Sequence, residues 1–189
     1  MKLLLTFFLM NLSLIPPCSA QDYARLAEGP NNSYLISYRV EKGNIKFRYF
    51  YFGTGKSYPS VNIDVNQNGM IDNMLDRSYG LTGSGPNWEL CSHYLIDETR
   101  TTFCGEPQSK AKVKRELLRN ADNTFTEFSI PIKELTASLP NGIIHVRIQI
   151  SNSSGTGDNE SWVRTNFPEC TSDLNCTGLF DKVYEIKIK

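Results

Sequence analysis

Residues 64–72 read DVNQNGMID and carry oxygen-bearing side chains at alternate positions of a short stretch. Asp64, Asn66, Asn68 and Asp72 stand at its first, third, fifth and ninth positions, and Gly69 stands at the sixth. This spacing is typical of a calcium loop, because Ca2+ takes about six to eight oxygen ligands and alternate Asx side chains can turn inward together. The sequence therefore predicts a Ca2+ site, with the backbone carbonyl of Met70 as a further ligand.

The residues around this stretch differ from those of a helix-loop-helix calcium site. Leu75 occupies the twelfth position, where such a site has a glutamate, and the nearest carboxylate is Asp76. Residues 60–65 alternate apolar and polar side chains, which predicts a strand. We therefore expect the loop to lie on a sheet with Asp76 as an additional ligand. The alternative is a plain hairpin, because Asn68-Gly69 is also a strong hairpin signal.

Period-two alternation recurs along most of the chain. It predicts strands over 34–40, 45–52, 58–65, 126–132, 144–150, 162–166 and 184–188, with 110–118 ambiguous between strand and helical turn. One face of 45–52 begins with Lys46 and Arg48 and becomes aromatic at Phe50 and Phe52. Short strands separated by Gly, Asn, Asp and Ser turns predict an all-β fold, a jelly-roll-like antiparallel β-sandwich.

Two segments carry a family resemblance. The first is 58–64, leading to Asn68-Gly69, and the second holds an E-x-x-I-P-x-x-x-L pattern at Glu127, Ile130, Pro131 and Leu135. Together they resemble the sugar- and haem-binding sandwich superfamily that includes family 9 carbohydrate-binding modules and DOMON domains. The resemblance implies a β-sandwich and a metal-binding loop, and it supports these two features better than it supports any ligand.

Sugar-binding members of that superfamily hold a sugar between aromatic rings, and Trp88 and Trp162 are the candidates here. Tryptophan is also a common core residue, so packing is the alternative role for both. Haem-binding members use Met and His ligands. Met70 and Met74 lie in or beside the calcium loop and His145 lies in mid-strand, so no such pair stands out.

The N-terminus indicates export. Residues 1–20 have Lys2, an apolar run and a small-x-small ending, so they predict a signal peptide and a mature chain from Gln21. Residues 21–189 then form one domain, with 21–32 as a lead-in without regular structure. Export to an oxidising compartment predicts two disulfides among Cys91, Cys104, Cys170 and Cys176. We favour the local pairs 91–104 and 170–176, with the other pairings and a zinc site as alternatives.

Composition excludes several function classes. The formal net charge is zero, which argues against nucleic acid as a partner, and no second apolar stretch could span a membrane. With His93 and His145 as the mature histidines and no G-x-S-x-G or phosphate-loop pattern, catalysis is not expected. The basic run 110–119 is interpreted as a solvated or edge strand, and Asp158 and Glu160 as a second cation site or solvated residues.

The sequence thus predicts a secreted or periplasmic, calcium-stabilised monomeric module that binds a ligand, most plausibly a carbohydrate. A module that binds another extracellular protein is the alternative, and a hydrolase is less favoured.

Overall fold

Alternating burial along the strands divides the chain into two facing sheets. In the computed structural model, β3 (Asn44–Tyr51) buries every second side chain, and β4 (Lys56–Asp64) follows the same period over its first half. The structure describes residues 23–29, 33–53, 56–69, 76–84, 87–94, 109–117, 124–135, 140–154, 161–168 and 183–188. Because successive side chains of a strand point to opposite faces, each sheet offers one apolar face to the other.

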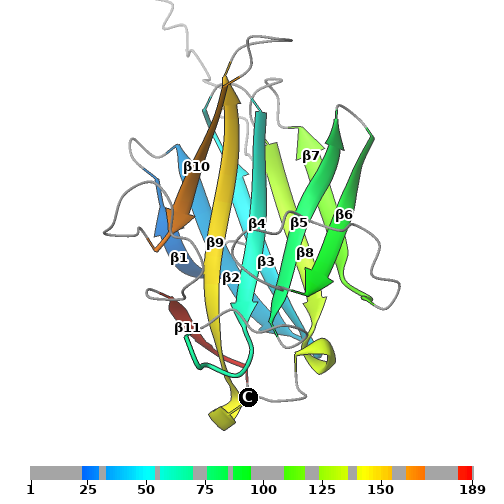
Figure 1. Cartoon of the computed structure of the whole chain (residues 1–189), viewed down its shortest axis with the longest axis vertical. Helices are drawn as coiled ribbons and strands as arrows, with labels where there is room; N and C mark the ends of the chain where they lie inside the picture. The colour runs from blue at the N-terminus through cyan, green and yellow to red at the C-terminus, as the bar shows by residue number, and fades with distance from the viewer. Residues whose placement is uncertain are drawn as a thin grey trace, which may run out of the picture.

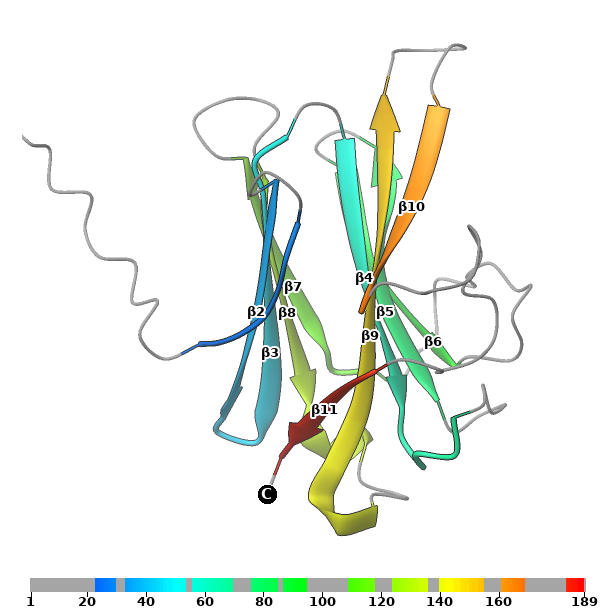
Figure 2. The ribbon, with the colours of Figure 1, turned by 90° about the vertical axis from the view of Figure 1, so that its left-hand side faces the viewer.

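Both sheets are antiparallel, and Figure 2 shows them edge-on as two layers. The five-stranded sheet A has the order β1 (Ala24–Glu28), β2 (Tyr34–Glu41), β3, β8 (Thr124–Pro131) and β7 (Lys112–Leu117). The six-stranded sheet B has the order β10 (Ser161–Phe167), β9 (Ile143–Ser154), β4, β5 (Arg77–Ser84) and β6 (Asn87–Tyr94). The sixth strand, β11 (Tyr184–Lys187), pairs with β9 beyond the end of β10.

Three connections cross between the sheets. The chain passes from sheet A to sheet B between β3 and β4, returns to sheet A between β6 and β7, and passes again to sheet B between β8 and β9 (Figure 1). Strand β3 pairs with β8, with Phe47 opposite Phe128, and β4 pairs with β9, with Val61 opposite Ile148. The central strands of both layers are therefore held by contacts between distant parts of the sequence.

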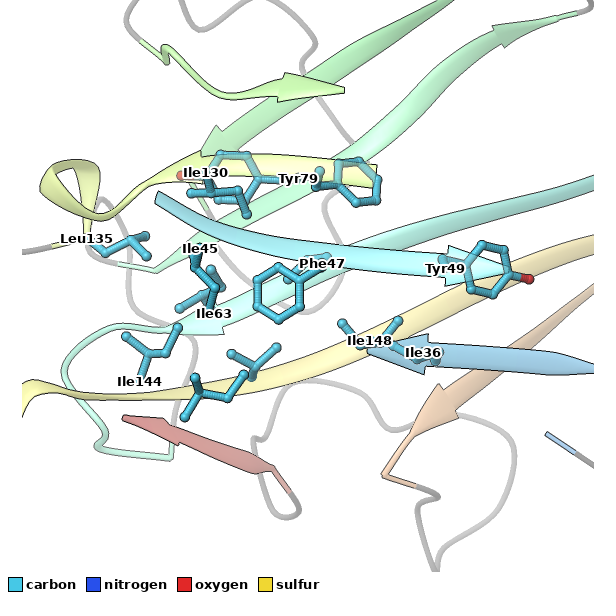
Figure 3. Close-up of a cluster of buried hydrophobic side chains, with 14 of the residues drawn as sticks. Ile36, Ile45, Phe47, Tyr49, Ile63, Tyr79, Ile130, Leu135, Ile144 and Ile148 are labelled. Atoms are coloured by element: carbon cyan, nitrogen blue, oxygen red, sulfur yellow. The ribbon is translucent and has the colours of Figure 1, made fainter. Parts of the chain in front are cut away.

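The core fills the space between the central strands (Figure 3). Its largest fully buried members are Tyr79, Phe47, Phe128, Ile36, Ile45, Ile63, Ile130, Leu135, Ile144, Ile148, Ile150 and Ile186. Most of them are β-branched or aromatic, which suits a pleated surface that is buried on one side. Strand β9 supplies the apolar row Ile144, Val146, Ile148 and Ile150, as its sequence predicted.

Short turns close the ends of the strands. Lys42 and Gly43 have φ values of 49° and 77°, the left-handed pair that a tight hairpin between β2 and β3 requires. Two 3-10 turns, η3 (Ile132–Glu134) and η5 (Pro140–Gly142), lead from β8 toward β9. Strand β8 ends at Pro131, and η3 follows it directly.

The fold differs from the sequence prediction at three places. Residues 24–28 form β1 rather than an irregular lead-in, and two strands, β5 and β6, occupy part of the stretch 77–104 in which no strand was expected. The ambiguous segment near 110–118 is the strand β7. No helix among the described residues is long and apolar enough to cross a membrane. The predicted signal peptide lies outside the described residues.

Candidate functional site

The loop after β4 is organised around the carboxylate of Asp64. Its Oδ1 accepts the backbone N–H of Gln67 at 2.7 Å and its Oδ2 accepts that of Gly69 at 3.0 Å. Asn66 Oδ1 likewise accepts the N–H of Asn68 at 3.2 Å. Gln67 and Gly69 have positive φ values, so the chain curls around the Asp64 side chain. Asp64 and Asn66 therefore turn their oxygens toward backbone N–H groups within the loop.

A second carboxylate closes the base of this loop. Asp76 stands one position before β5, and its Oδ1 accepts the backbone N–H of Val65 at 2.9 Å. Both Asp64 and Asp76 are 0% exposed. Both buried carboxylates of this loop therefore accept hydrogen bonds from backbone N–H groups, which offsets part of the cost of burying them.

His145 is a neighbour of Asp64 on the adjacent strand β9. It lies opposite Asp64 in the β4–β9 register, with Nδ1 3.8 Å from Asp64 Oδ2 and Nε2 3.7 Å from Glu185 Oε1. Its position opposite the apolar face of β9 suggests a solvated side chain, but the side chain of His145 is only 18% exposed.

The described part of the loop contains side-chain oxygen atoms of the kind that a hard divalent cation binds. Asp64, Asn66 and Asp76 offer carboxylate and amide oxygens, which is the ligand type that Ca2+ takes. Asn68 is exposed, while Met70 and Asp72 lie outside the described residues. In the part of the chain that the structure describes, no group of three or more His, Cys, Asp or Glu side chains is close enough to hold a metal ion. The geometry of the remaining ligands thus stays a prediction.

The two tryptophans lie on opposite outer strands of sheet B. Trp88 is in β6 and pairs with Gly83, whereas Trp162 is in β10 and pairs with Ser153. Three strands separate β6 from β10, so at about 4.8 Å per strand their backbones are about 19 Å apart. This spacing does not suit two rings that clasp one sugar. Cys91 lies in β6 opposite Gly80, and Cys104, Cys170 and Cys176 fall outside the described residues.

The outer face of sheet A carries an aromatic surface that spans two central strands. We call Phe50, Phe52 and Phe125 the phenylalanine surface. Phe50 lies opposite Phe125 in the β3–β8 register, with ring centroids 5.0 Å apart. The ring centroids of Phe50 and Phe52 lie 6.2 Å apart, and the angle between the two ring planes is 2°. Phe52 is 49% exposed, so the phenylalanine surface presents an apolar ring to solvent.

A charged group borders the phenylalanine surface. Arg48 Nε donates to Glu127 Oε2 at 2.6 Å, and the hydroxyl of Tyr23 donates to the same oxygen at 2.9 Å. The guanidinium of Arg48 lies 3.8 Å from the centre of the Tyr23 ring, and that of Arg39 lies 4.7 Å from it. Burial, with the Glu127 hydrogen bond and charge, raises the pKa of Tyr23 to about 12. This group is a rigid polar rim beside an aromatic platform.

Part of this surface was visible in the sequence. The polar-to-aromatic face of 45–52 indicated Phe50 and Phe52, and the family pattern singled out Glu127. Tyr23 and Phe125 carried no such signal, because their position depends on pairing between segments far apart in the chain. Tyr23 lies in the stretch that was predicted to be an irregular lead-in. Phe125 lies on the outer face of a strand that was recognised from its inward-facing residues.

A polar cluster joins the two sheets at the end of the sandwich where β3 ends and β4 begins. Tyr49 Oη and Ser57 Oγ are 2.5 Å apart, and Ser57 Oγ donates to Asn152 Oδ1 at 2.7 Å. Asn152 Nδ2 in turn donates to the hydroxyl of Tyr34. Burial raises the pKa of both Tyr34 and Tyr49. Because its amide is used in this network, Asn152 is a poor acceptor for glycosylation despite its N-x-[ST] context.

No protein family and no curated protein matches the chain. Among solved structures, it is similar to a carbohydrate-binding module of family 9 from Caldicellulosiruptor kristjanssonii, solved in complex with cellotriose. The identity is 15%, the TM-score is 0.48, and the match covers 77% of this chain and 70% of that chain. This is the family whose motifs the sequence resembles.

Proposed function

We propose that this protein is a non-catalytic carbohydrate-binding module that holds its ligand on the outer face of sheet A. The observation that carries the proposal is the phenylalanine surface, with Phe52 half-exposed and nearly parallel to Phe50. The C–H faces of a sugar ring pack well on such aromatic faces, while its hydroxyls need hydrogen-bonding partners at the edge.

The polar rim supplies those partners. Arg48 and Glu127 are held against each other and by Tyr23, so their positions are fixed before a ligand arrives. A preorganised charged pair loses little side-chain freedom on binding, which favours affinity. The site thus combines one apolar platform with donors and acceptors of defined geometry, the composition typical of small-ligand sites.

The proposal includes one Ca2+ in the loop 64–76. Its support is the pair of buried carboxylates, Asp64 and Asp76, in a loop whose side-chain oxygens already turn inward. Asn66, Asn68, Asp72 and the carbonyl of Met70 would complete the ligand set. The ion would stabilise the connection between β4 and β5 rather than contact the sugar, because sheet B lies on the other side of the core.

We further propose that the chain is exported by the signal peptide 1–20 and carries disulfides 91–104 and 170–176. The support is the sequence pattern, since these residues, apart from the backbone of Cys91, lie outside the described part of the chain.

A protein partner is the second candidate. Phe52, which follows β3 on the outer side of sheet A, is one of the exposed large apolar side chains among the described residues. An apolar patch with a charged rim also fits a protein interface. The two candidates differ in what competes for the surface: free oligosaccharides displace a glycan ligand but not a protein.

A glycan array tests the proposal. We expect wild-type protein to bind at least one oligosaccharide class, and Phe52→Ala to weaken that binding. Losing one stacked ring costs about 1 kcal/mol, which is roughly a fivefold to tenfold loss of affinity. Val40→Ala, at the far end of sheet A, is the matched control and should bind as wild type. Binding that survives both Phe50→Ala and Phe52→Ala would contradict the proposed site.

A further inference from the structure

Arg115 departs from the pattern of its own strand. In β7, Lys112, Lys114 and Glu116 are exposed, whereas Arg115 turns toward the space between the sheets. Its Nη2 donates to the carbonyl of Ser57 at 3.0 Å, and its guanidinium lies 4.9 Å from the centre of the Tyr58 ring. The side chain therefore crosses from sheet A to the first residues of β4. The basic run 110–119 thus includes an edge strand, as one of its two interpretations predicted, but Arg115 is not a solvated member of it.

The charge of Arg115 is not balanced within the described part of the chain. No described carboxylate lies within ion-pair distance of it, and its neighbours are the tyrosines 49 and 58 and a backbone carbonyl. Its Nη1 is buried and has no hydrogen-bond partner among the described residues. Burial lowers the pKa of the guanidinium. A buried cation normally has an anion beside it, because losing its water is otherwise uncompensated.

Thr126 provides a second, independent observation. It lies directly opposite Arg115 in the β7–β8 register, so both side chains project from the same face of sheet A. Thr126 is 0% exposed, and its Oγ1 has no hydrogen-bond partner among the described residues. Cross-strand neighbours have their Cβ atoms about 5 Å apart, so a single small group can accept from both side chains.

Strand pairing leaves a side from which a ligand can approach. Among the described residues, β4 pairs with β5 only from Val61 to Ile63, so the stretch 56–60 next to Arg115 has no β5 partner. Arg115 itself is on an edge strand and is partly exposed.

We propose that Arg115 and Thr126 form a binding site for an oxyanion, the carboxylate or sulfate group of a small ligand. The guanidinium donates from Nη1 and the threonine hydroxyl donates from Oγ1, while the Tyr58 ring covers one side of the guanidinium. The site faces the interior at the open end of the sandwich. It is separate from the phenylalanine surface, which lies on the opposite face of sheet A, so it does not depend on the proposed function.

Thermal unfolding in the presence of small anions tests this site. The probes are sodium glucuronate, acetate and sulfate, each compared with sodium chloride at the same ionic strength. We expect a saturable rise in Tm for wild type with at least one probe, and the probes distinguish a carboxylate from a sulfate preference. Arg115→Met should abolish the rise, and Thr126→Val, which keeps the side-chain volume, should weaken the apparent affinity about tenfold.

Lys112→Met is the matched control, because it removes an exposed cation from the same strand and should leave the anion effect unchanged. Sulfate also stabilises folded proteins without binding, and that contribution is the same in all variants. If Arg115→Met does not fold, Thr126→Val alone decides the outcome. A rise that is equal in Thr126→Val and wild type would overturn the proposal. So would a solved structure in which a water molecule or one of the chain's own carboxylates contacts Nη1.

Discussion

Asp64 is the residue on which the account of the metal site depends. It is a buried carboxylate whose partners are backbone N–H groups and a histidine at 3.8 Å. The alternation of Asx residues with glycine at the sixth position predicted this inward orientation, because it specifies a local turn. The sequence could not show that Asp76 is buried beside Val65, since that contact requires β4 and β5 to pair.

The first residue-scale prediction concerns Asp64→Asn. Wild type should lose Tm when a chelator removes Ca2+, because an ion that binds only the folded state at about 100 times its Kd adds about 2.7 kcal/mol. For a chain of this size that corresponds to roughly 5–10 °C. Asp64→Asn should start lower and be insensitive to the chelator.

Glu185→Gln is the control for this experiment, since it removes a charge near His145 without touching the loop. Its response to the chelator should match that of wild type. A wild-type Tm that does not change with the chelator would remove the calcium site from the account.

The second residue-scale prediction concerns Tyr23. Its pKa is about 12 in the folded protein and about 10 in the unfolded chain, so the folded state holds the proton more tightly. Its contribution to stability is therefore complete below pH 10 and is lost as the pH rises toward 12. Wild type should lose Tm more steeply than Tyr23→Phe over this interval. Parallel curves for the two proteins, measured by thermal unfolding, would show that the hydroxyl is not held by Glu127.

At the scale of elements, the turn between β2 and β3 shows how local sequence sets the sheet register. Gly43 has a φ of 77°, and a Cβ at this position would project into open space. Glycine is therefore favoured here by the backbone conformation and not by a lack of room for a side chain. Gly43→Ala should destabilise the protein by about 1 kcal/mol, because a residue with a Cβ resists this region. Lys42, at φ 49°, carries the same strain, so Lys42→Asn should stabilise. Denaturant unfolding measures both, and equal stability of Gly43→Ala and wild type would contradict this reading of the turn.

Elements with strict alternation were predictable, and those without it were not. Strand β9 repeats isoleucine and valine on one face and was recognised directly, as were β2, β3 and β4. Strand β5 buries Tyr79, but Gly80 and Gly83 stand at positions where apolar and polar side chains would show the alternation of a strand. Because glycine has no side chain, the period-two pattern is weak in this segment. Strand β1 is short and shows a register shift between Arg25 and Ala27, which breaks its alternation.

At the scale of the whole molecule, the two sheets have different outer faces. Sheet A carries the phenylalanine surface and its charged rim, and sheet B carries the Asx loop at one end. The all-β architecture and the Asx loop could be predicted because both depend on sequence patterns of a few neighbouring residues. The pairing of β3 with β8, which brings Phe50 to Phe125, could not, because no local pattern states which strands become neighbours.

The same limit explains the tryptophans. Trp88 and Trp162 were chosen by residue type, and only the strand order β10-β9-β4-β5-β6 shows that their strands lie at opposite sides of sheet B. Residue type identifies candidates for sugar stacking, whereas topology decides which of them can act together.

The most direct test of the binding surface is an NMR titration of isotope-labelled protein with the oligosaccharide that binds best on the array. The account predicts that amide shifts concentrate on the outer-face positions of β3 and β8, at Arg48, Phe50, Phe52, Phe125 and Glu127. Shifts that concentrate on β6 and β10, around Trp88 and Trp162, would contradict it.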